Sequence, residues 1–422
     1  MTSGTLEFEG TRYLDGSASD PNLLGWMQGA PPADLKRIRF EDDNFFKFPE
    51  IRWSLSHVRE LLPTVPVWRG GGARSNLGVL TDAAVALIDA LAFDDLQGRR
   101  LTWAQALLDT YTDGILVLHR GRRVYERYFG ALRPHGTHIC FSITKSYAAT
   151  LAATLLHEGV LDETKPVPYY LAELRGTAYA DATLRQVLDM QIGVAYSEHY
   201  ADPEAQFWSY AFAGGLRPRP AGYSGPDNHY DFLKTLRKQG EHGAAFEYKT
   251  VNTEVLCWIM ARVSGVPLAR MLSERIWSRL GCEEDAYIAV DSIGVATGGA
   301  GLNANLRDLA RFGELMRCEG AWGGQQIIPA EVVADIRRGS DPAKFATAGY
   351  HLLPGYSYRN MWWVGPQQSG IFEGRGIHGQ RLYVVPGSEL VIARFASHPI
   401  AASAANDIIT LPAFAALTRL IN

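Results

Sequence analysis

The chain has 422 residues, of which 47% are hydrophobic and 20% are charged, proportions typical of a globular protein rather than a disordered chain or a fibre. Its 41 Lys and Arg residues nearly balance its 45 Asp and Glu residues, so the formal net charge is −4. Such a chain lacks the positive field of a nucleic-acid-binding protein, and we expect no nucleic-acid partner.

The cysteines and the N-terminal segment predict a cytoplasmic protein. Cys140, Cys257, Cys282 and Cys318 lie far apart in a long chain, which is not the spacing of a disulfide framework. The first residues, MTSGTLEFEG, contain neither the basic nor the apolar region of a secretory signal. We find no run of about 18 apolar residues, so we expect no membrane span and no membrane partner.

The N-terminal part of the chain predicts an arm followed by a hairpin and a helix. Residues 1–85 are rich in Gly, Pro, Asp and Arg, which is typical of irregular structure laid over a main body. The segment WRGGGARS (68–75) is predicted to be a loop, because no Gly-Lys-Ser/Thr follows to make it a phosphate cradle. The alternating segment 114–129 predicts a β-hairpin, and Ala and Leu at helical spacing predict a helix over 143–162.

The rest of the chain divides into a helical middle and a strand-rich end. Further helices are predicted at 184–190, 253–265, 268–281 and 306–318. From residue 357 the pattern is that of successive antiparallel strands, and an apolar helix over 404–421 follows them.

Strands at both ends of a helical middle indicate an α/β protein of the α+β type. We expect one antiparallel sheet, built from both chain ends and flanked by helices, with an inserted all-α lobe. The predicted divisions are an N-terminal arm at 1–100, a sheet domain at 101–170 and 320–422, and a helical domain at 171–319.

Ser142 and Lys145 are the first candidates for chemistry. They open the apolar helix at positions i and i+3, so they share one helix face and the amine can reach the hydroxyl. A lysine in a dry site can lose its proton and become a base for a serine nucleophile. The competing interpretation is that Ser142 caps the helix while Lys145 is solvated, and the spacing alone does not decide between the two.

Two other segments could contribute to a site. Tyr248 precedes the predicted helix at 253–265, where a tyrosine either packs or presents its phenol. The segment 374–380, GRGIHGQ, places several glycines in a predicted strand, which suggests close approach to the backbone by something such as a substrate oxygen.

Alternative sites are less well supported. The chain has no Gly-x-Ser-x-Gly nucleophile elbow and no dinucleotide-binding fingerprint. His135, His138 and Cys140 match no standard zinc spacing, so we expect no metal.

In this order, the three segments resemble those of the serine β-lactamase and penicillin-binding-protein superfamily. Within its class C branch, the chain is most similar to the 6-aminohexanoate-dimer hydrolases, which degrade nylon oligomers, and to related carboxylesterases. The likeness covers roughly residues 105–420 and is carried by YTDGILVL, LRQVLDMQIGVAYSEHYADP, FEYKTVNTEVLCWI, GGAGLNANLRDLARFGELM and GIHGQRLYV. It implies a β-lactamase-like fold.

The resemblance also implies a role for each candidate. Ser142 would be the acylated nucleophile, Lys145 its neutral base, and Tyr248 the proton shuttle to the leaving group. The backbone N–H groups of Ser142 and Ile377 would form the oxyanion hole. Tyr200 would line the pocket, and neither a metal nor a cofactor would be needed.

The chain departs from the superfamily pattern at three positions. Thr250 occupies the third place of the Tyr motif, where β-lactamases carry Asn. Gly374-Arg375-Gly376 replaces the Lys-Thr-Gly strand motif, so Arg375, with His378 nearby, is expected to contact substrate. Ala211 occupies the place where an acid would hold the ammonium of a nylon dimer, and a bound ammonium there would lack its counter-charge.

These features predict a serine hydrolase for small carboxylic esters. Short linear amides of the 6-aminohexanoate-oligomer type are further candidate substrates. The rival within the fold is a β-lactamase or D-amino-acid peptidase or amidase, and the rival outside catalysis is a binding protein with an inactive site.

The aromatic residues of 203–246 either pack an ordinary helix or form an apolar acyl pocket. The expected partner is a small-molecule ester or amide, and the chain could pair as a homodimer.

Overall fold

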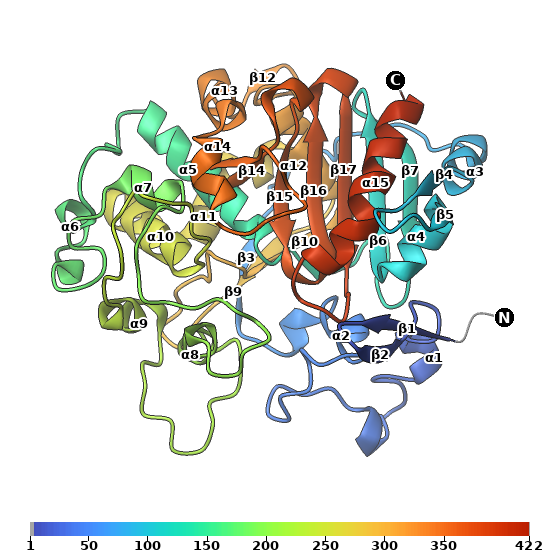
Figure 1. Cartoon of the computed structure of the whole chain (residues 1–422), viewed down its shortest axis with the longest axis horizontal. Coiled ribbons are helices and arrows are strands. Elements are labelled where there is room, and N and C mark those ends of the chain that lie inside the picture. Colours follow the sequence, from blue (N-terminus) through green and yellow to red (C-terminus); the bar gives the residue numbers. More distant parts are fainter. Residues whose placement is uncertain (1–3, 422) are drawn as a thin grey trace.

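A seven-stranded antiparallel sheet forms the centre of the computed structural model, which describes residues 4–421 (Figure 1). Its strands lie in the order β13-β14-β15-β16-β17-β6-β7. Their bounds are β6 Thr112–His119, β7 Arg122–Tyr128, β13 Ser357–Arg359, β14 Trp362–Val364, β15 Phe372–Gly376, β16 Gln380–Val385 and β17 Leu390–Ala396. The predicted hairpin therefore pairs with the C-terminal strands, which confirms a sheet built from both ends of the chain.

Both faces of this sheet are buried, as its alternating side chains show. Ile115 and Val117 on β6 pack with α15 (Ala404–Ile421) and α4 (Trp103–Asp109). Leu116 and Leu118 point to the other face, where α12 (Leu306–Arg317) and α5 (Ile143–His157) lie. Because successive strand residues point to opposite faces, a strand covered on both sides reads as one continuous apolar run.

A second antiparallel sheet has the strand order β3-β9-β10-β8 and lies beneath the start of α5. Its strands are β3 Thr64–Val67, β8 Thr137–Ile139, β9 Ala286–Ala289 and β10 Leu302–Asn305. Strands β9 and β10, together with α12, belong to residues that we had predicted inside the helical domain. The contacts correct this expectation, because α12 packs on β6, β16 and β17 of the large sheet rather than among the lobe helices.

The helical lobe lies to the left of the large sheet in Figure 1. Its helices are α6 Val167–Tyr170, α7 Leu184–Leu188, α8 Gln206–Ala213, α9 His229–Thr235, α10 Val251–Ser264 and α11 Leu268–Arg275. The predicted helices at 184–190 and 253–265 are confirmed, while that at 268–281 ends earlier and continues as a short 3₁₀ turn. In the sequence, four short elements stand between α12 and strand β13 of the large sheet. They are β11 Ala321–Trp322, β12 Gln325–Gln326, α13 Ala330–Arg338 and α14 Pro342–Ala346.

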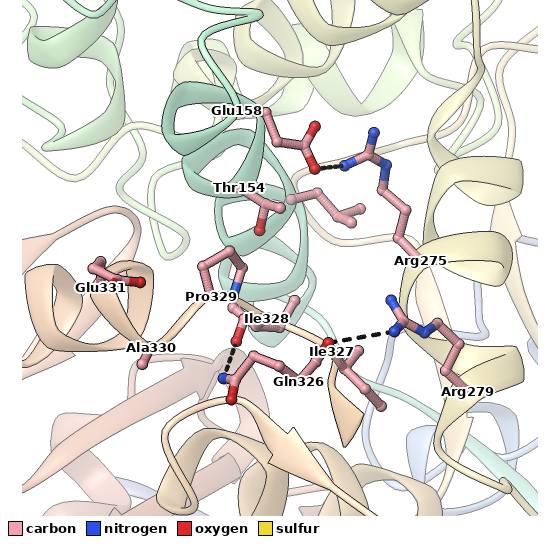
Figure 2. Close-up of a pocket in the computed structure, with 11 residues that line it drawn as sticks. Thr154, Glu158, Arg275, Arg279, Gln326, Ile327, Ile328, Pro329, Ala330 and Glu331 are labelled. Carbon is pink, nitrogen blue, oxygen red and sulfur yellow. Dashed lines mark hydrogen bonds and ion pairs between the residues drawn. The ribbon is translucent and has the colours of Figure 1, made fainter. Parts of the chain in front are cut away.

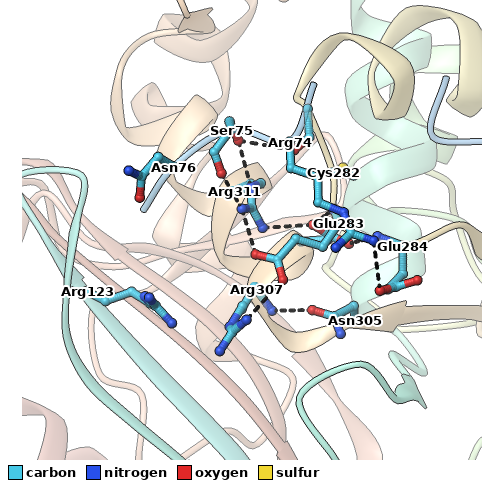
Figure 3. A network of polar contacts seen from close by, with 12 residues as sticks. Arg74, Ser75, Asn76, Arg123, Cys282, Glu283, Glu284, Asn305, Arg307 and Arg311 are labelled. Atoms are coloured by element: carbon cyan, nitrogen blue, oxygen red, sulfur yellow. Dashed lines mark hydrogen bonds and ion pairs between the residues drawn. The ribbon is translucent and has the colours of Figure 1, made fainter. Parts of the chain in front are cut away.

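The N-terminal arm contains more regular structure than its composition predicted. It includes α1 Pro21–Leu24, α2 Ile51–Ser54, α3 Asp82–Asp89, β1 Thr5–Phe8, β2 Thr11–Leu14, β4 Ala92–Asp94 and β5 Arg100–Thr102. Arg52 ties the arm to the large sheet through a buried ion pair with Asp113, 2.7 Å long. Figure 3 shows a second tie, in which Arg311 of α12 donates to the Ser75 carbonyl over 2.6 Å and pairs with Glu283 over 2.8 Å. The loop expected at 68–75 is thus held against the main body.

Helix α15 is the one described helix that is long and apolar enough to cross a membrane by length and composition. This differs from our expectation that no such segment exists. Its packing explains the composition, since Phe414 contacts Trp103 and Tyr383, with ring centroids 6.1 and 5.3 Å apart. The apolar side chains of α15 cover the sheet.

Helix α15 also carries a charge into the interior. Asp407 pairs with Arg375 of β15 and Arg381 of β16, and both arginines also pair with Glu373, at 2.9 and 3.0 Å. All four side chains are almost completely buried, so two positive and two negative charges compensate one another without solvent.

Removing one member of this four-residue ion-pair ring should be costly. We expect Asp407→Ala to lower the free energy of unfolding by about 3–5 kcal/mol, because it leaves two buried guanidinium groups short of a carboxylate. Urea unfolding followed by circular dichroism measures the change. Glu274→Ala removes an exposed partner of Arg270 and should change the free energy by less than about 1 kcal/mol. Equal effects of the two substitutions would contradict a stabilising role for the ring.

Candidate active site

Ser142 stands at a tight turn between β8 and α5. Phe141, the residue before it, has φ +43°, a left-handed conformation that is rare for a bulky side chain and marks local strain. The turn is anchored on the second sheet, where the Cys140 N–H donates to the Leu302 carbonyl over 2.7 Å. Ser142 makes no side-chain cap to the helix, so the capping interpretation is wrong. Ser142 is nearly buried, with 8% of the residue exposed.

Lys145 is completely buried, at 0% exposure, so the solvated-lysine interpretation is also wrong. Its Nζ lies 2.8 Å from Ser142 Oγ and donates to the Gly299 carbonyl over 2.7 Å. Burial lowers the pKa of Lys145 to about 8, although the negative charges of Glu198 and Glu254 act in the opposite direction. With this pKa the amine is neutral in about a tenth of the molecules at pH 7, and mostly neutral above pH 8, whereas an ordinary lysine is neutral in a far smaller fraction.

Tyr248 completes a group of three side chains around the Ser142 hydroxyl. Its ring centroid is 5.0 Å from Lys145 Nζ, and its ring packs against Trp363 at 5.5 Å. Desolvation raises the pKa of the Tyr248 phenol well above its usual value, while a hydrogen bond with Ser142 lowers it. Three predicted residues from two separate segments are therefore brought together.

The glycines of β15 have a different cause from the one we predicted. A Cβ at Gly376 would lie 2.8 Å from the Cys140 carbonyl, and one at Gly374 would lie 3.1 Å from Ile143 Cγ2. The close neighbour is thus the turn and helix of the nucleophile rather than a substrate oxygen. This packing places Ile377, which follows the strand, beside the same turn, and its role as an oxyanion donor stays a prediction.

Arg375 and His378 are less available to a substrate than predicted. Both terminal nitrogens of Arg375 pair with the buried carboxylates of Glu373 and Asp407, so its charge is compensated inside the protein rather than offered to a substrate carboxylate. His378 is buried and contacts the His398 carbonyl through Nδ1 at 2.7 Å. Burial lowers the pKa of His378 to about 4, so its ring is neutral at neutral pH.

Tyr200 lies in a loop that the structure ties to the Tyr motif. Its phenol donates to Glu198 over 2.6 Å, and Glu198 also accepts from the N–H and hydroxyl of Thr250, each over 2.5 Å. Our sequence reasoning missed Glu198, although its place two residues before Tyr200 was a usable signal. The Thr250 hydroxyl thereby anchors this loop next to Tyr248.

Ala211 is buried within α8 among core residues, and its predicted place in the substrate site stays a prediction. Around it, Phe207 contacts both Tyr200 and Trp208, with ring centroids 4.9 and 5.1 Å apart. The N-terminal arm adds Phe46, whose ring centroid is 6.0 Å from that of Phe141. An aromatic ring of the distant arm therefore lies beside the nucleophile turn.

A second missed feature is the segment Gly298-Gly299. The N–H groups of both glycines donate to the buried carboxylate of Glu254, and the Gly299 carbonyl accepts from Lys145. The sequence GGAG was visible, but nothing in its spacing pointed to a distant lysine.

A separate cavity of about 500 Å³ has a different set of lining residues, most of which are labelled in Figure 2. It opens between the second half of α5 and α11, with Leu151, Arg275 and Ile328 among its lining residues. None of Ser142, Lys145 and Tyr248 lines it, so the chemistry of the side chains, and not cavity size, identifies the candidate site.

The residues considered for zinc are engaged otherwise. His138 Nε2 lies 3.2 Å from Asp113, and its Nδ1 lies 3.0 Å from the Ile139 carbonyl. Burial raises the pKa of the Cys140 thiol. Within residues 4–421, no cluster of three or more His, Cys, Asp or Glu side chains could hold a metal ion.

Comparison with known proteins agrees with this geometry. Residues 102–413 match the Beta-lactamase family. The 6-aminohexanoate-dimer hydrolase of Paenarthrobacter ureafaciens is 32% identical over 389 residues, which are 92% of this chain and 91% of that protein. A Bacillus anthracis structure assigned provisionally to the same activity has a TM-score of 0.83 and 30% identity, covering 93% of this chain and 99% of that one.

More distant structures share the fold. EstCE1, a hydrolase with promiscuous acyltransferase activity, has a TM-score of 0.59 at 14% identity and covers 74% of this chain and 96% of its own. The family match spans most of the chain, and the relatives of 30% identity or more cover nearly all of it. The protein therefore belongs to the beta-lactamase family and is a hydrolase.

Proposed function

We propose that the protein is a serine hydrolase that cleaves small carboxylic esters, and short linear amides, through an acyl-enzyme on Ser142. The observation that carries the proposal is the 2.8 Å contact between Ser142 Oγ and a buried lysine amine whose pKa is lowered to about 8. A neutral amine at this distance can accept the hydroxyl proton, and the oxygen then attacks a substrate carbonyl.

The steps that follow use the same residues. Attack forms a C–O bond to Ser142 and an oxyanion, which the N–H groups of Ser142 and Ile377 would stabilise. The proton now on Lys145 passes through Tyr248 to the leaving alcohol or amine, and the bond to that group breaks. Water then attacks the acyl-enzyme, releases the acid and restores the Ser142 hydroxyl.

The relatives support the amide part of the proposal, since two of them are named for 6-aminohexanoate-dimer hydrolysis. Ala211 supports the ester part, because no carboxylate stands at this position to pair with a substrate ammonium. Esters, which need less help for the leaving group, are thus the favoured substrates, and amides without a terminal ammonium come next.

Covalent labelling tests the nucleophile. We expect a fluorophosphonate to form one adduct, located on Ser142 by peptide mass spectrometry, and Ser142→Ala to abolish it. Lys145→Ala should slow labelling by about 10²–10⁴-fold, the usual contribution of a general base. Ser146→Ala, on the same helix, should label at the rate of the unaltered protein, and an adduct elsewhere would reject the proposal.

The pH dependence of labelling tests the base. Lys145 accepts a proton only when neutral, so the rate should rise about tenfold per pH unit below its pKa and level off above about 8. Stopped-flow measurement with a reagent that is itself insensitive to pH gives the profile. A rate that is constant between pH 6 and pH 9 would contradict a lysine base with this pKa.

A substrate panel separates the rival activities. We expect p-nitrophenyl butyrate to be hydrolysed with a kcat/KM at least tenfold above those for nitrocefin, a D-Ala-D-Ala peptide and the 6-aminohexanoate dimer. Initial rates with purified protein give the ratios, and Ser142→Ala measures the background. Preference for the lactam or the D-peptide would identify the rival activity instead.

A further inference from the structure

The contact between Lys145 and Gly299 has a consequence for the proposed function, on which this inference rests. A neutral amine has two N–H bonds and one lone pair, and the lone pair must face Ser142 Oγ to receive its proton. The Gly299 carbonyl, 2.7 Å from Nζ, takes one N–H and so limits how the amine can rotate. The place of one backbone carbonyl therefore helps to decide whether the lysine can act as a base.

Glu254 holds this carbonyl in place. Its Oε1 accepts from the Gly299 N–H over 2.8 Å and its Oε2 from the Gly298 N–H over 3.0 Å. The Tyr210 phenol donates a third hydrogen bond, 2.7 Å long, to Oε1. Three donors converge on two oxygens, an arrangement that suits a group which only accepts, as a carboxylate does.

The two glycines are required by how closely this segment lies against α10. A Cβ at Gly298 would lie 2.3 Å from Cys257 Sγ, and one at Gly299 would lie 2.4 Å from Thr250 Cγ2. Any larger residue would push the segment off the helix and move the Gly299 carbonyl away from Lys145. The glycines and Glu254 thus serve the same contact.

Glu254 is an unusual residue for purely structural packing. It is 2% exposed, and among the described residues it forms no ion pair, so a carboxylate is kept in the interior with uncharged partners alone. Such burial is costly, and an apolar or amide side chain would fill the space at lower cost. Helix α10 begins three residues after Tyr248, so one helix supports both partners of Ser142.

We infer that Glu254 is a positioning residue of the active site. By clamping the N–H groups of Gly298 and Gly299, it aims the Gly299 carbonyl at Lys145 and orients the amine toward Ser142. Glu254 itself is not expected to touch substrate.

The charge of Glu254 supports this assignment independently. Its carboxylate is one of two that raise the pKa of Lys145 against the larger lowering by burial. Removing this charge should lower the pKa of Lys145 further, and the acid limb of the rate profile should move to lower pH. The acid limb thus reports the charge of Glu254, whereas the plateau rate reports its positioning of the amine.

Glu254→Gln tests orientation and charge together. Its amide keeps one acceptor oxygen but turns an NH₂ group toward the second backbone N–H, so the segment should shift. We expect the labelling rate of Ser142 on the high-pH plateau to fall about 10–100-fold, the effect of misplacing a catalytic group by up to an ångström. The acid limb should move to lower pH, and KM for p-nitrophenyl butyrate should change little.

Two further variants separate the contributions. Glu254→Asp keeps the charge but is too short to reach both N–H groups, so its rate should fall while the acid limb stays in place. Tyr210→Phe keeps the two-pronged clamp and should lose less rate than Glu254→Gln; it also serves if Glu254→Gln fails to fold. Glu274→Gln removes an exposed carboxylate of α11 and should match the unaltered protein.

The outcomes for Glu254 and for the proposed function are distinguishable. An unaltered protein that is not labelled at Ser142 rejects the proposed function, whereas Glu254 is then still tested by the ¹³Cε chemical shift of Lys145 against pH, assigned with Lys145→Ala. A lower pKa of Lys145 in Glu254→Gln shows that the charge of Glu254 acts on the lysine, and a lower plateau rate supports its positioning role. A folded Glu254→Gln with the plateau rate and Lys145 titration of the unaltered protein would overturn it.

Discussion

The rest of the structure depends on the burial of one amine beside one hydroxyl. In water a lysine is protonated at neutral pH and cannot act as a base. Here the surroundings of Lys145 exclude water so fully that desolvation outweighs two nearby carboxylates and lowers its pKa to about 8. The buried first turns of α5, the close approach of β15 and the Gly298-Gly299 segment all maintain this exclusion.

Buried acids have two different tasks in this fold. In the four-residue ion-pair ring, Glu373 and Asp407 neutralise Arg375 and Arg381 and join α15 to the sheet. Glu254 instead accepts hydrogen bonds only from uncharged groups. It is linked to Lys145 through Gly299, whose N–H it binds and whose carbonyl accepts from the lysine. In the ring, opposite charges neutralise one another and stabilise the fold. The carboxylate of Glu254 has no such partner, and its negative charge raises the pKa of Lys145.

Much of the fold and the centre of the site could be predicted from local patterns. Ser142 and Lys145 are one helical turn apart, so their contact follows from helix geometry once the helix is recognised. Arg375 was expected to contact substrate because its pairing with Asp407, on the distant helix α15, cannot be recognised in the sequence. Its other partner, Glu373, lies two residues earlier on the same strand. The glycines of β15 were assigned to substrate because a sequence does not show which backbone a strand will approach. Residues 286–317 were placed in the lobe because the helical period of residues 306–317 is the same whether α12 packs on helices or on a sheet. The short strands β9 and β10 were not recognised in the sequence.

The sequence by itself determined the class of fold, the one-turn spacing of serine and lysine, and the strands at both ends that build the large sheet. These properties depend on the periods of helix and strand, which act over a few residues. The resemblance implied that Tyr248 joins that pair, but only the tertiary structure decided that Gly299, Glu198 and Glu254 surround it and that Arg375 pairs with a buried acid. These contacts join segments tens to hundreds of residues apart, where burial and charge compensation, rather than local spacing, select the partners.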